Sequence, residues 1–85
     1  MKVRVRYLSV IREQAGRRED ELELPPGSVL KAAADWLAAN RGIVVPGTRL
    51  MATLNGRGWS QLPDALSSTL EDGDEIALFP LVSGG

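Results

Sequence analysis

The chain ends in two glycines, Gly84 and Gly85, and the chemistry that we expect of this sequence lies at its terminal carboxylate. Because glycine has no Cβ, two glycines in a row can enter a narrow channel and adopt backbone angles closed to other residues. At roughly 3.3–3.6 Å per extended residue, the stretch from Leu81 to Gly85 spans about 17 Å. We therefore expect a slim tail, residues 81–85, that carries the carboxylate away from a folded domain of residues 1–80.

The residues before the tail predict how it is aimed. An acidic turn centred on Gly73 leads into a short apolar strand from Glu75 to Phe79. Pro80 ends that strand, because proline has no N–H to donate to a sheet. Small residues are common at disordered termini, so the glycine pair alone would favour an inert end. The turn and the strand change that interpretation.

Two stretches resemble the small subunit of molybdopterin synthase, which belongs to the MoaD/ThiS group of ubiquitin-like sulfur carriers. The first, residues 71–85, contains Asp-Gly-Asp-Glu, an apolar strand, Phe-Pro and Val-Ser-Gly-Gly. The second, residues 7–16, is similar to that subunit's first strand and short helix. Length and element order also agree, so the resemblance covers nearly the whole chain. Leu81 stands where the family usually has a second proline. This departure leaves open which pathway the carrier serves, but it does not change the class of protein that the resemblance indicates.

The resemblance implies a carrier function without a self-contained active site. The carboxylate of Gly85 would be adenylated by a separate E1-like activating enzyme, which uses ATP and Mg, while this chain itself binds no cofactor. A cysteine desulfurase or rhodanese would supply sulfur, and the resulting terminal thiocarboxylate would donate it to a pterin in the large synthase subunit. Gly85 is thus the expected attachment site, and the residues expected for recognition of the tail are Val82, Ser83 and Gly84.

Docking also requires a surface on the folded domain. Successive strand residues point to opposite faces, so if Leu78 is in the core, Phe79 lies on the open face. An exposed aromatic beside a functional tail is a suitable interface anchor, although Phe79 could instead be tucked beneath a loop. The residues that we expect to bind a partner surround the base of the tail: Phe79, Leu81, Leu8 and Leu54.

Composition limits the alternatives. The 85 residues make one domain, and the hydrophobic fraction of 44% is enough for an apolar core. The sequence has no Cys and no His, which excludes a disulfide, a Cys/His zinc site and a Ser-His-Asp triad within it. A formal net charge of −1 gives no reason to expect nucleic acid as a partner. No apolar run is long enough for a membrane span and no signal peptide is evident, so we expect a cytoplasmic protein.

Hydrophobic periodicity predicts an α+β domain. Residues Lys2–Leu8 alternate with period two, and Ser9 is expected to cap a short helix that ends at Gly16. Ser28 is expected to cap a helix from Val29 to about Asn40, whose apolar stripe faces a sheet. The other expected strands are Glu19–Leu24, Arg49–Leu54, a weak return strand at Trp59–Leu62, and Glu75–Phe79. The family resemblance selects the β-grasp fold: a mixed sheet of four to five strands with one main helix on one face.

Three polar clusters have structural interpretations. The loop Asn55-Gly56-Arg57-Gly58 lacks the spacing and the Lys-Ser/Thr pair of a phosphate-binding loop, so a hairpin turn is expected. The turn Asp72-Gly73-Asp74 lacks the rest of a calcium loop, and no metal site is expected there. The acids of residues 19–23 are interpreted as an exposed charged edge.

The sequence leaves other functions open. Within the same chemistry, the carrier could serve thiamine synthesis, cysteine synthesis or tRNA thiolation. A ubiquitin-like modifier would instead be joined to other proteins through Gly85. A third class is a plain interaction domain with an inert tail.

Overall fold

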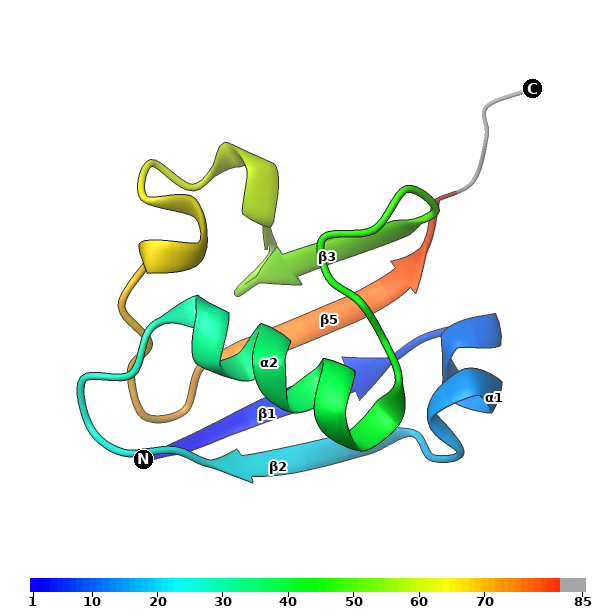
Figure 1. The fold of residues 1–85 in the computed structure, drawn as a ribbon, viewed down its shortest axis with the longest axis horizontal. Coiled ribbons are helices and arrows are strands. Elements are labelled where there is room, and N and C mark those ends of the chain that lie inside the picture. The colour runs from blue at the N-terminus through cyan, green and yellow to red at the C-terminus, as the bar shows by residue number, and fades with distance from the viewer. Residues whose placement is uncertain (82–85) are drawn as a thin grey trace.

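In the computed structural model, which describes residues 1–81, five strands form one mixed sheet and the main helix packs across one of its faces (Figure 1). Within these residues, no helix has both the length and the apolar character that crossing a bilayer requires. The elements in chain order are β1 (Lys2–Tyr7), α1 (Val10–Ala15), β2 (Glu19–Glu23), α2 (Leu30–Arg41), β3 (Leu50–Leu54), β4 (Arg57–Gly58), the 3₁₀ turns η1 (Trp59–Gln61) and η2 (Ala65–Ser67), and β5 (Glu75–Pro80).

The first and last strands lie side by side near the centre of the sheet. The strand order is β2-β1-β5-β3-β4. The pair β1–β5 is parallel, and the other three pairs are antiparallel. A parallel pair needs a long crossover, which the intervening hairpin elements and α2 supply. This is the β-grasp arrangement, so the predicted fold class is confirmed.

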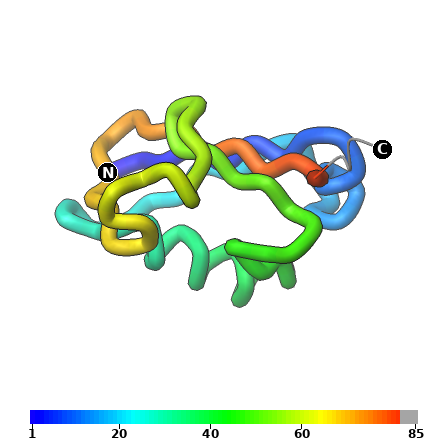
Figure 2. The backbone as a smooth tube through the Cα atoms, turned by 90° about the horizontal axis from the view of Figure 1, so that it is seen from above, coloured from blue at the N-terminus to red at the C-terminus, as the bar shows by residue number. Residues whose placement is uncertain are grey.

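The core lies between α2 and the sheet (Figure 2). Leu30, Ala33 and Leu37 form the buried stripe of α2, as the periodicity predicts. Two other members of the predicted stripe, Val29 and Trp36, are only partly buried. The sheet contributes fully buried side chains from its central strands: Val3, Val5, Tyr7, Ile76 and Leu78.

The expected serine cap of α2 is wrong. Val29, not Ser28, occupies the N-cap of α2, and the Ser28 hydroxyl donates to the Pro25 carbonyl at 2.7 Å. The Leu30 N–H donates instead to the Ser68 carbonyl at 2.8 Å, so a distant loop supplies the acceptor that a capping side chain would provide. Ser9 occupies the N-cap position of α1, as expected, but its side chain makes no cap hydrogen bond.

The return strand is also displaced from its predicted position. Leu54 pairs with Arg57, so Asn55-Gly56 alone makes the hairpin turn and β4 follows at once. The chain then leaves the sheet edge in η1, where Trp59 is buried. The predicted strand at Trp59–Leu62 therefore does not form.

Candidate functional site

Strand β5 holds the base of the tail in a fixed position. It lies between β1 and β3, and its core-facing residues Ile76 and Leu78 are fully buried. Where β5 ends, the Leu8 N–H donates to the Leu78 carbonyl at 2.9 Å. The Leu81 N–H donates to the Arg49 carbonyl at 3.0 Å, and the Leu81 side chain is 52% exposed. The backbone is therefore held on both sides up to Leu81.

The residues predicted for activation and tail recognition follow immediately. Val82, Ser83, Gly84 and Gly85 lie outside the described residues. Strand β5 ends at Pro80. The division into a domain of residues 1–80 and a tail of residues 81–85 stays a prediction.

Side-chain hydrogen bonds hold the turn that starts β5. Gly73 has a φ of 88°, which favours glycine. The Asp74 carboxylate accepts hydrogen bonds from the Glu71 N–H at 2.8 Å and from the Asn55 side-chain amide at 2.9 Å. The Asn55 side-chain oxygen accepts one from the Glu75 N–H at 2.9 Å. Asn55 thus ties the β3–β4 hairpin to the start of β5, a contact that sequence reasoning missed because it joins segments about twenty residues apart.

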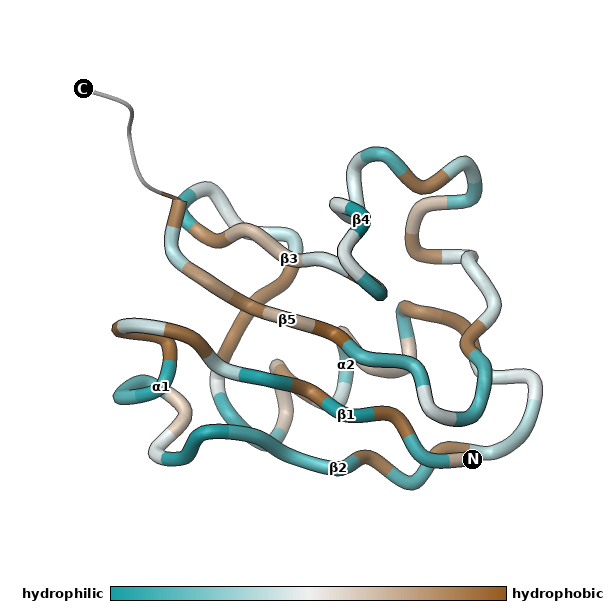
Figure 3. The backbone as a smooth tube through the Cα atoms, turned by 180° about the vertical axis from the view of Figure 1, so that it is seen from behind, coloured by the Kyte–Doolittle hydropathy of each residue, from teal (hydrophilic) through white to brown (hydrophobic). Residues whose placement is uncertain are grey.

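Hydrophobic residues gather where β5 and β1 end (Figure 3), and several of them lie on the open face of the sheet. Phe79 lies on this face, since Leu78 beside it is in the core, and it is partly exposed. Met51 on β3 is the cross-strand partner of Phe79. Leu8 follows Tyr7, the partner of Leu78 in the parallel pair, and therefore lies next to Phe79. We call Leu8, Met51, Phe79 and Leu81 the tail-base patch.

Leu54 does not belong to this patch, which corrects the sequence prediction. It pairs with Ile76, whose side chain is in the core, and Leu54 itself is 8% exposed. The register between β3 and β5 decides which β3 residues face outward, and that register is not readable from the sequence of either strand. Met51 takes the place expected for Leu54.

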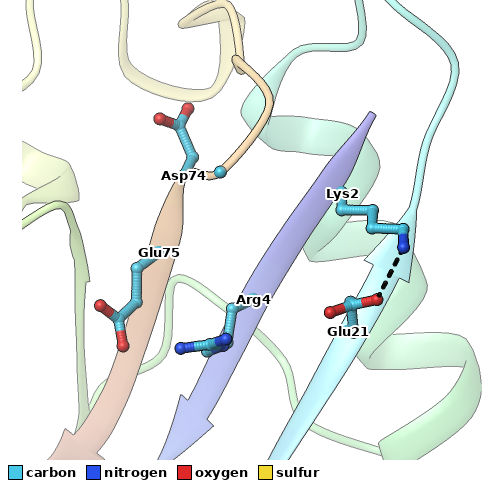
Figure 4. Close-up of a pocket in the computed structure, with 6 residues that line it drawn as sticks. Lys2, Arg4, Glu21, Asp74 and Glu75 are labelled. Carbon is cyan, nitrogen blue, oxygen red and sulfur yellow. Dashed lines mark ion pairs between the residues drawn. The ribbon is translucent and has the colours of Figure 1, made fainter.

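The other end of the open face carries nearly balanced charges (Figure 4). Lys2, Arg4, Glu21, Asp74 and Glu75 surround a shallow hollow of about 160 Å³, which Gly73 completes. The Lys2 Nζ lies 3.7 Å from the Glu21 carboxylate. Two cations thus face three carboxylates, which is typical of a solvated ladder of exposed ion pairs.

A buried polar cluster joins β1, β2 and α2 on the other side of the sheet. Asp20 is 9% exposed, which corrects its predicted place on an exposed edge. Its carboxylate accepts hydrogen bonds from the Tyr7 hydroxyl at 2.6 Å, from Arg41 Nε and Nη2 at 2.8 and 2.9 Å, and from Arg17 Nη1 at 2.9 Å. Its neighbours on β2 are exposed as predicted: Glu19, Glu21 and Glu23.

This Asp20 cluster shifts the pKa values of its members. The hydrogen bonds from Arg41 are the largest cause that lowers the pKa of Asp20, from 3.8 to about 2, and the Tyr7 and Arg17 bonds add to it against the opposing effect of burial. Burial, followed by the hydrogen bond to Asp20, raises the pKa of the Tyr7 hydroxyl. Every oxygen of the carboxylate is engaged, so the cluster fastens α2 to the sheet and offers no free base.

Comparison with family models gives a match over nearly the entire chain. The model described as the ThiS family matches residues 5–85. A search of curated proteins finds no match.

Solved structures similar to this chain come from archaea and bacteria. A putative molybdopterin converting factor subunit 1 from Pyrococcus furiosus is 26% identical, with 96% of this chain and 99% of that chain covered and a TM-score of 0.77. A complex of subunits 1 and 2 of the molybdopterin-converting factor from Helicobacter pylori 26695 contains a chain that is 26% identical, with full coverage of both chains and a TM-score of 0.70. The small archaeal modifier protein SAMP1 from Methanosarcina acetivorans is 25% identical, with 99% and 96% coverage and a TM-score of 0.79.

Proposed function

The chain belongs to the ThiS family of ubiquitin-like sulfur carriers and modifiers, and from this premise we propose that it carries sulfur for molybdopterin synthesis on the carboxylate of Gly85. The observation that carries the proposal is the family match, which extends through the glycine pair to residue 85. The structure adds that β5, the strand leading to the tail, is the middle strand of the five-stranded sheet. A rigid strand presents the tail from a fixed point, which limits the entropy lost when a partner binds it.

The proposed chemistry converts a poor electrophile into a good one. A Gly85 carboxylate oxygen attacks the α-phosphorus of ATP and releases pyrophosphate, leaving an acyl adenylate. A persulfide sulfur of a donor protein then attacks the carbonyl carbon and expels AMP. A thiol then attacks the donor protein's cysteine sulfur in the resulting S–S bond. This forms a new disulfide with that cysteine and leaves –COS⁻ on Gly85. ATP and Mg belong to the activating enzyme in this scheme, and the glycine tail is a substrate.

Three protein partners follow from this scheme: an E1-like activating enzyme, a sulfur donor such as a cysteine desulfurase or rhodanese, and the large subunit of molybdopterin synthase. The similar chain from Helicobacter pylori forms a complex with subunit 2 of the same converting factor, which supports a comparable pairing here. The tail-base patch offers an apolar surface beside the tail for these partners, with Phe79 as its aromatic anchor. Val82, Ser83 and Gly84 would be recognised through their backbone in the partner's channel.

A second candidate is a ubiquitin-like protein modifier joined to lysines through Gly85. The similarity to SAMP1 favours it. The two functions use the same adenylation step and differ in what attacks the activated carbonyl: sulfur in one case, a lysine amine in the other. Carriers for thiamine, cysteine or tRNA thiolation share the sulfur route and differ only in the acceptor.

Deletion of the gene in its own cells separates these pathways. Under the proposal, the deletion strain loses molybdenum cofactor, and the wild-type chain restores it while a chain without Gly85 does not. Normal cofactor levels with loss of thiamine, cysteine or thiolated tRNA would overturn the molybdopterin assignment in favour of another acceptor. High-mass conjugates that vanish with Gly85, with all of these products unchanged, would favour the modifier.

A further inference from the structure

Three arginines surround one hollow at the end of the sheet where β1 and β5 finish. Arg6 on β1, Arg12 on α1 and Arg18 just before β2 line a space of about 200 Å³, together with Tyr7, Leu8 and Glu19. We call Arg6, Arg12 and Arg18 the arginine hollow.

Its positive charge is poorly compensated by the residues that the structure describes. Among residues 1–81, no carboxylate oxygen lies within 4.0 Å of the guanidinium groups of Arg12 and Arg18; Arg12 Nε donates to the Tyr7 carbonyl at 3.4 Å. Arg6 Nη1 is 3.5 Å from a Glu75 oxygen. Among residues 1–81, Glu19 is the one acidic residue that lines the hollow, and its carboxylate lies 3.4 Å from Arg4 Nε. Its charge is therefore shared with an arginine outside the hollow. This contrasts with the nearly balanced hollow at the opposite end of the sheet.

The arginine hollow is continuous with the tail-base patch. Leu8 lines the hollow and is also a member of the patch beside Phe79. Because β1 and β5 are parallel, the arginines of β1 and α1 lie at the same end of the sheet as the base of the tail (Figure 1). A protein that seats on the patch and takes the tail would thus also cover the hollow.

We infer that the arginine hollow receives acidic side chains of the activating enzyme and orients the carrier while its tail enters the active site; this inference rests on the proposed function. The planar guanidinium fork matches a carboxylate and can bind it through two hydrogen bonds. A free phosphate or carboxylate ion is a poorer occupant, because the arginine side chains are exposed to solvent; the Arg6 side chain is 56% exposed. A single exposed ion pair changes a binding equilibrium by less than about tenfold. Several such pairs on a docked protein add to the apolar contact and steer its approach.

The test compares two double variants of the full-length chain in an adenylation assay. R12E/R18E reverses two charges of the hollow, and the control R57E/K31E reverses two exposed charges on β4 and α2, so both variants carry the same net charge. The readout is carrier-dependent exchange of labelled pyrophosphate into ATP, catalysed by the E1-like activating enzyme of the source cells at low and at high KCl. Circular dichroism checks that each variant is folded, and R18E alone replaces the double variant should α1 be disturbed.

We expect R12E/R18E to raise the KM for the carrier about tenfold or more at low salt with kcat unchanged, and the difference to shrink at high salt. The control should stay within about twofold of wild type. An R12E/R18E variant that behaves like the control would overturn the inference while leaving the proposed function standing. No exchange with the wild-type chain would count against the proposed function itself. Saturable binding of inorganic phosphate to Arg12 and Arg18, seen by NMR at submillimolar concentration, would assign the hollow to a small anion and also overturn the inference.

Discussion

Asp20 is the residue on which the attachment of α2 to the sheet depends. Its carboxylate receives hydrogen bonds from β1, through Tyr7, and from the C-terminal end of α2, through Arg41. A buried carboxylate with several charge-assisted bonds is stabilising only as long as all partners are present, because removing one leaves the others desolvated and unpaired.

The substitution Asp20→Asn tests this role. It keeps the size of the side chain but removes the charge that faces Arg41 and Arg17, and we expect the free energy of unfolding to fall by roughly 2–4 kcal/mol. The control Glu21→Gln, on the same strand but exposed, should change it by less than about 0.5 kcal/mol. Urea unfolding at neutral pH measures both. Equal effects of the two substitutions would show that Asp20 contributes no more than a surface charge.

The lowered pKa of Asp20 predicts a pH dependence with a definite sign. The group titrates near 3.8 in the unfolded chain and near 2 in the folded one, so its stabilisation is fully present above pH 3.8 and is lost as the pH falls through 2. The shift corresponds to about 2 kcal/mol at neutral pH. The stability gap between wild type and Asp20→Asn should therefore shrink by about 1.5 kcal/mol on going to about pH 2.5. A gap that stays constant in urea titrations over this range would contradict the assignment.

Asp20 and Leu54 were both expected to be exposed, and both are buried. They show which features of burial the sequence pattern alone does not determine. The sequence predicts the inward faces of β1 and α2 because apolar residues repeat at the right period. Period-two alternation places Asp20 on the same face as the buried Leu22, but the sequence does not show that its carboxylate finds partners there. Those partners include Tyr7 and Arg41, which are distant in the sequence. Leu54 is apolar on a strand with apolar residues on both faces, and only the pairing with β5 assigns its face.

Among the elements, β5 places two adjacent apolar residues on opposite faces of the sheet. Leu78 is fully buried in the core, while Phe79 is partly exposed on the open face beside Met51. The two side chains therefore face different environments although the backbone is the same.

Substituting each of these residues by aspartate distinguishes the two roles. Leu78→Asp places a charge in the core and should unfold the domain. Phe79→Asp should leave the far-UV circular dichroism native and weaken binding to the activating enzyme or the synthase large subunit, measured by calorimetry. Ala38→Asp, on the exposed side of α2, serves as the control for an added negative charge. Loss of structure in Phe79→Asp would show that this side chain belongs to the core instead.

The sequence predicts a helix or strand correctly where the preferences of neighbouring residues agree with the contacts that the folded chain makes. The left-handed glycines Gly16 and Gly42 end α1 and α2 as their positions predict. The start of α2 is predicted to within one residue, but its cap is not, because the Leu30 N–H donates to the Ser68 carbonyl of a distant loop and not to a neighbouring side chain. The predicted return strand is also wrong: tryptophan is common in strands, but Trp59 is buried in a 3₁₀ turn that leaves the sheet.

At the scale of the whole molecule, three features lie at one end of the sheet: the base of the tail, the tail-base patch and the arginine hollow. The parallel pairing of β1 and β5 brings them together, since it makes both strands finish at the same edge. The family resemblance predicted the fold and this pairing. The arginine hollow was not predictable, because Arg6, Arg12 and Arg18 come from three elements whose arrangement only the structure gives.

The most direct measurement is the intact mass of the protein purified from its own cells. The account predicts a species heavier by the difference between one sulfur and one oxygen, which disappears when Gly85 is deleted or when the activating enzyme is absent. It also predicts that the deletion leaves the thermal unfolding of residues 1–81 unchanged, since the fold does not depend on that residue. A wild-type chain that stays at its unmodified mass in cells containing the activating enzyme and the sulfur donor would contradict the central claim.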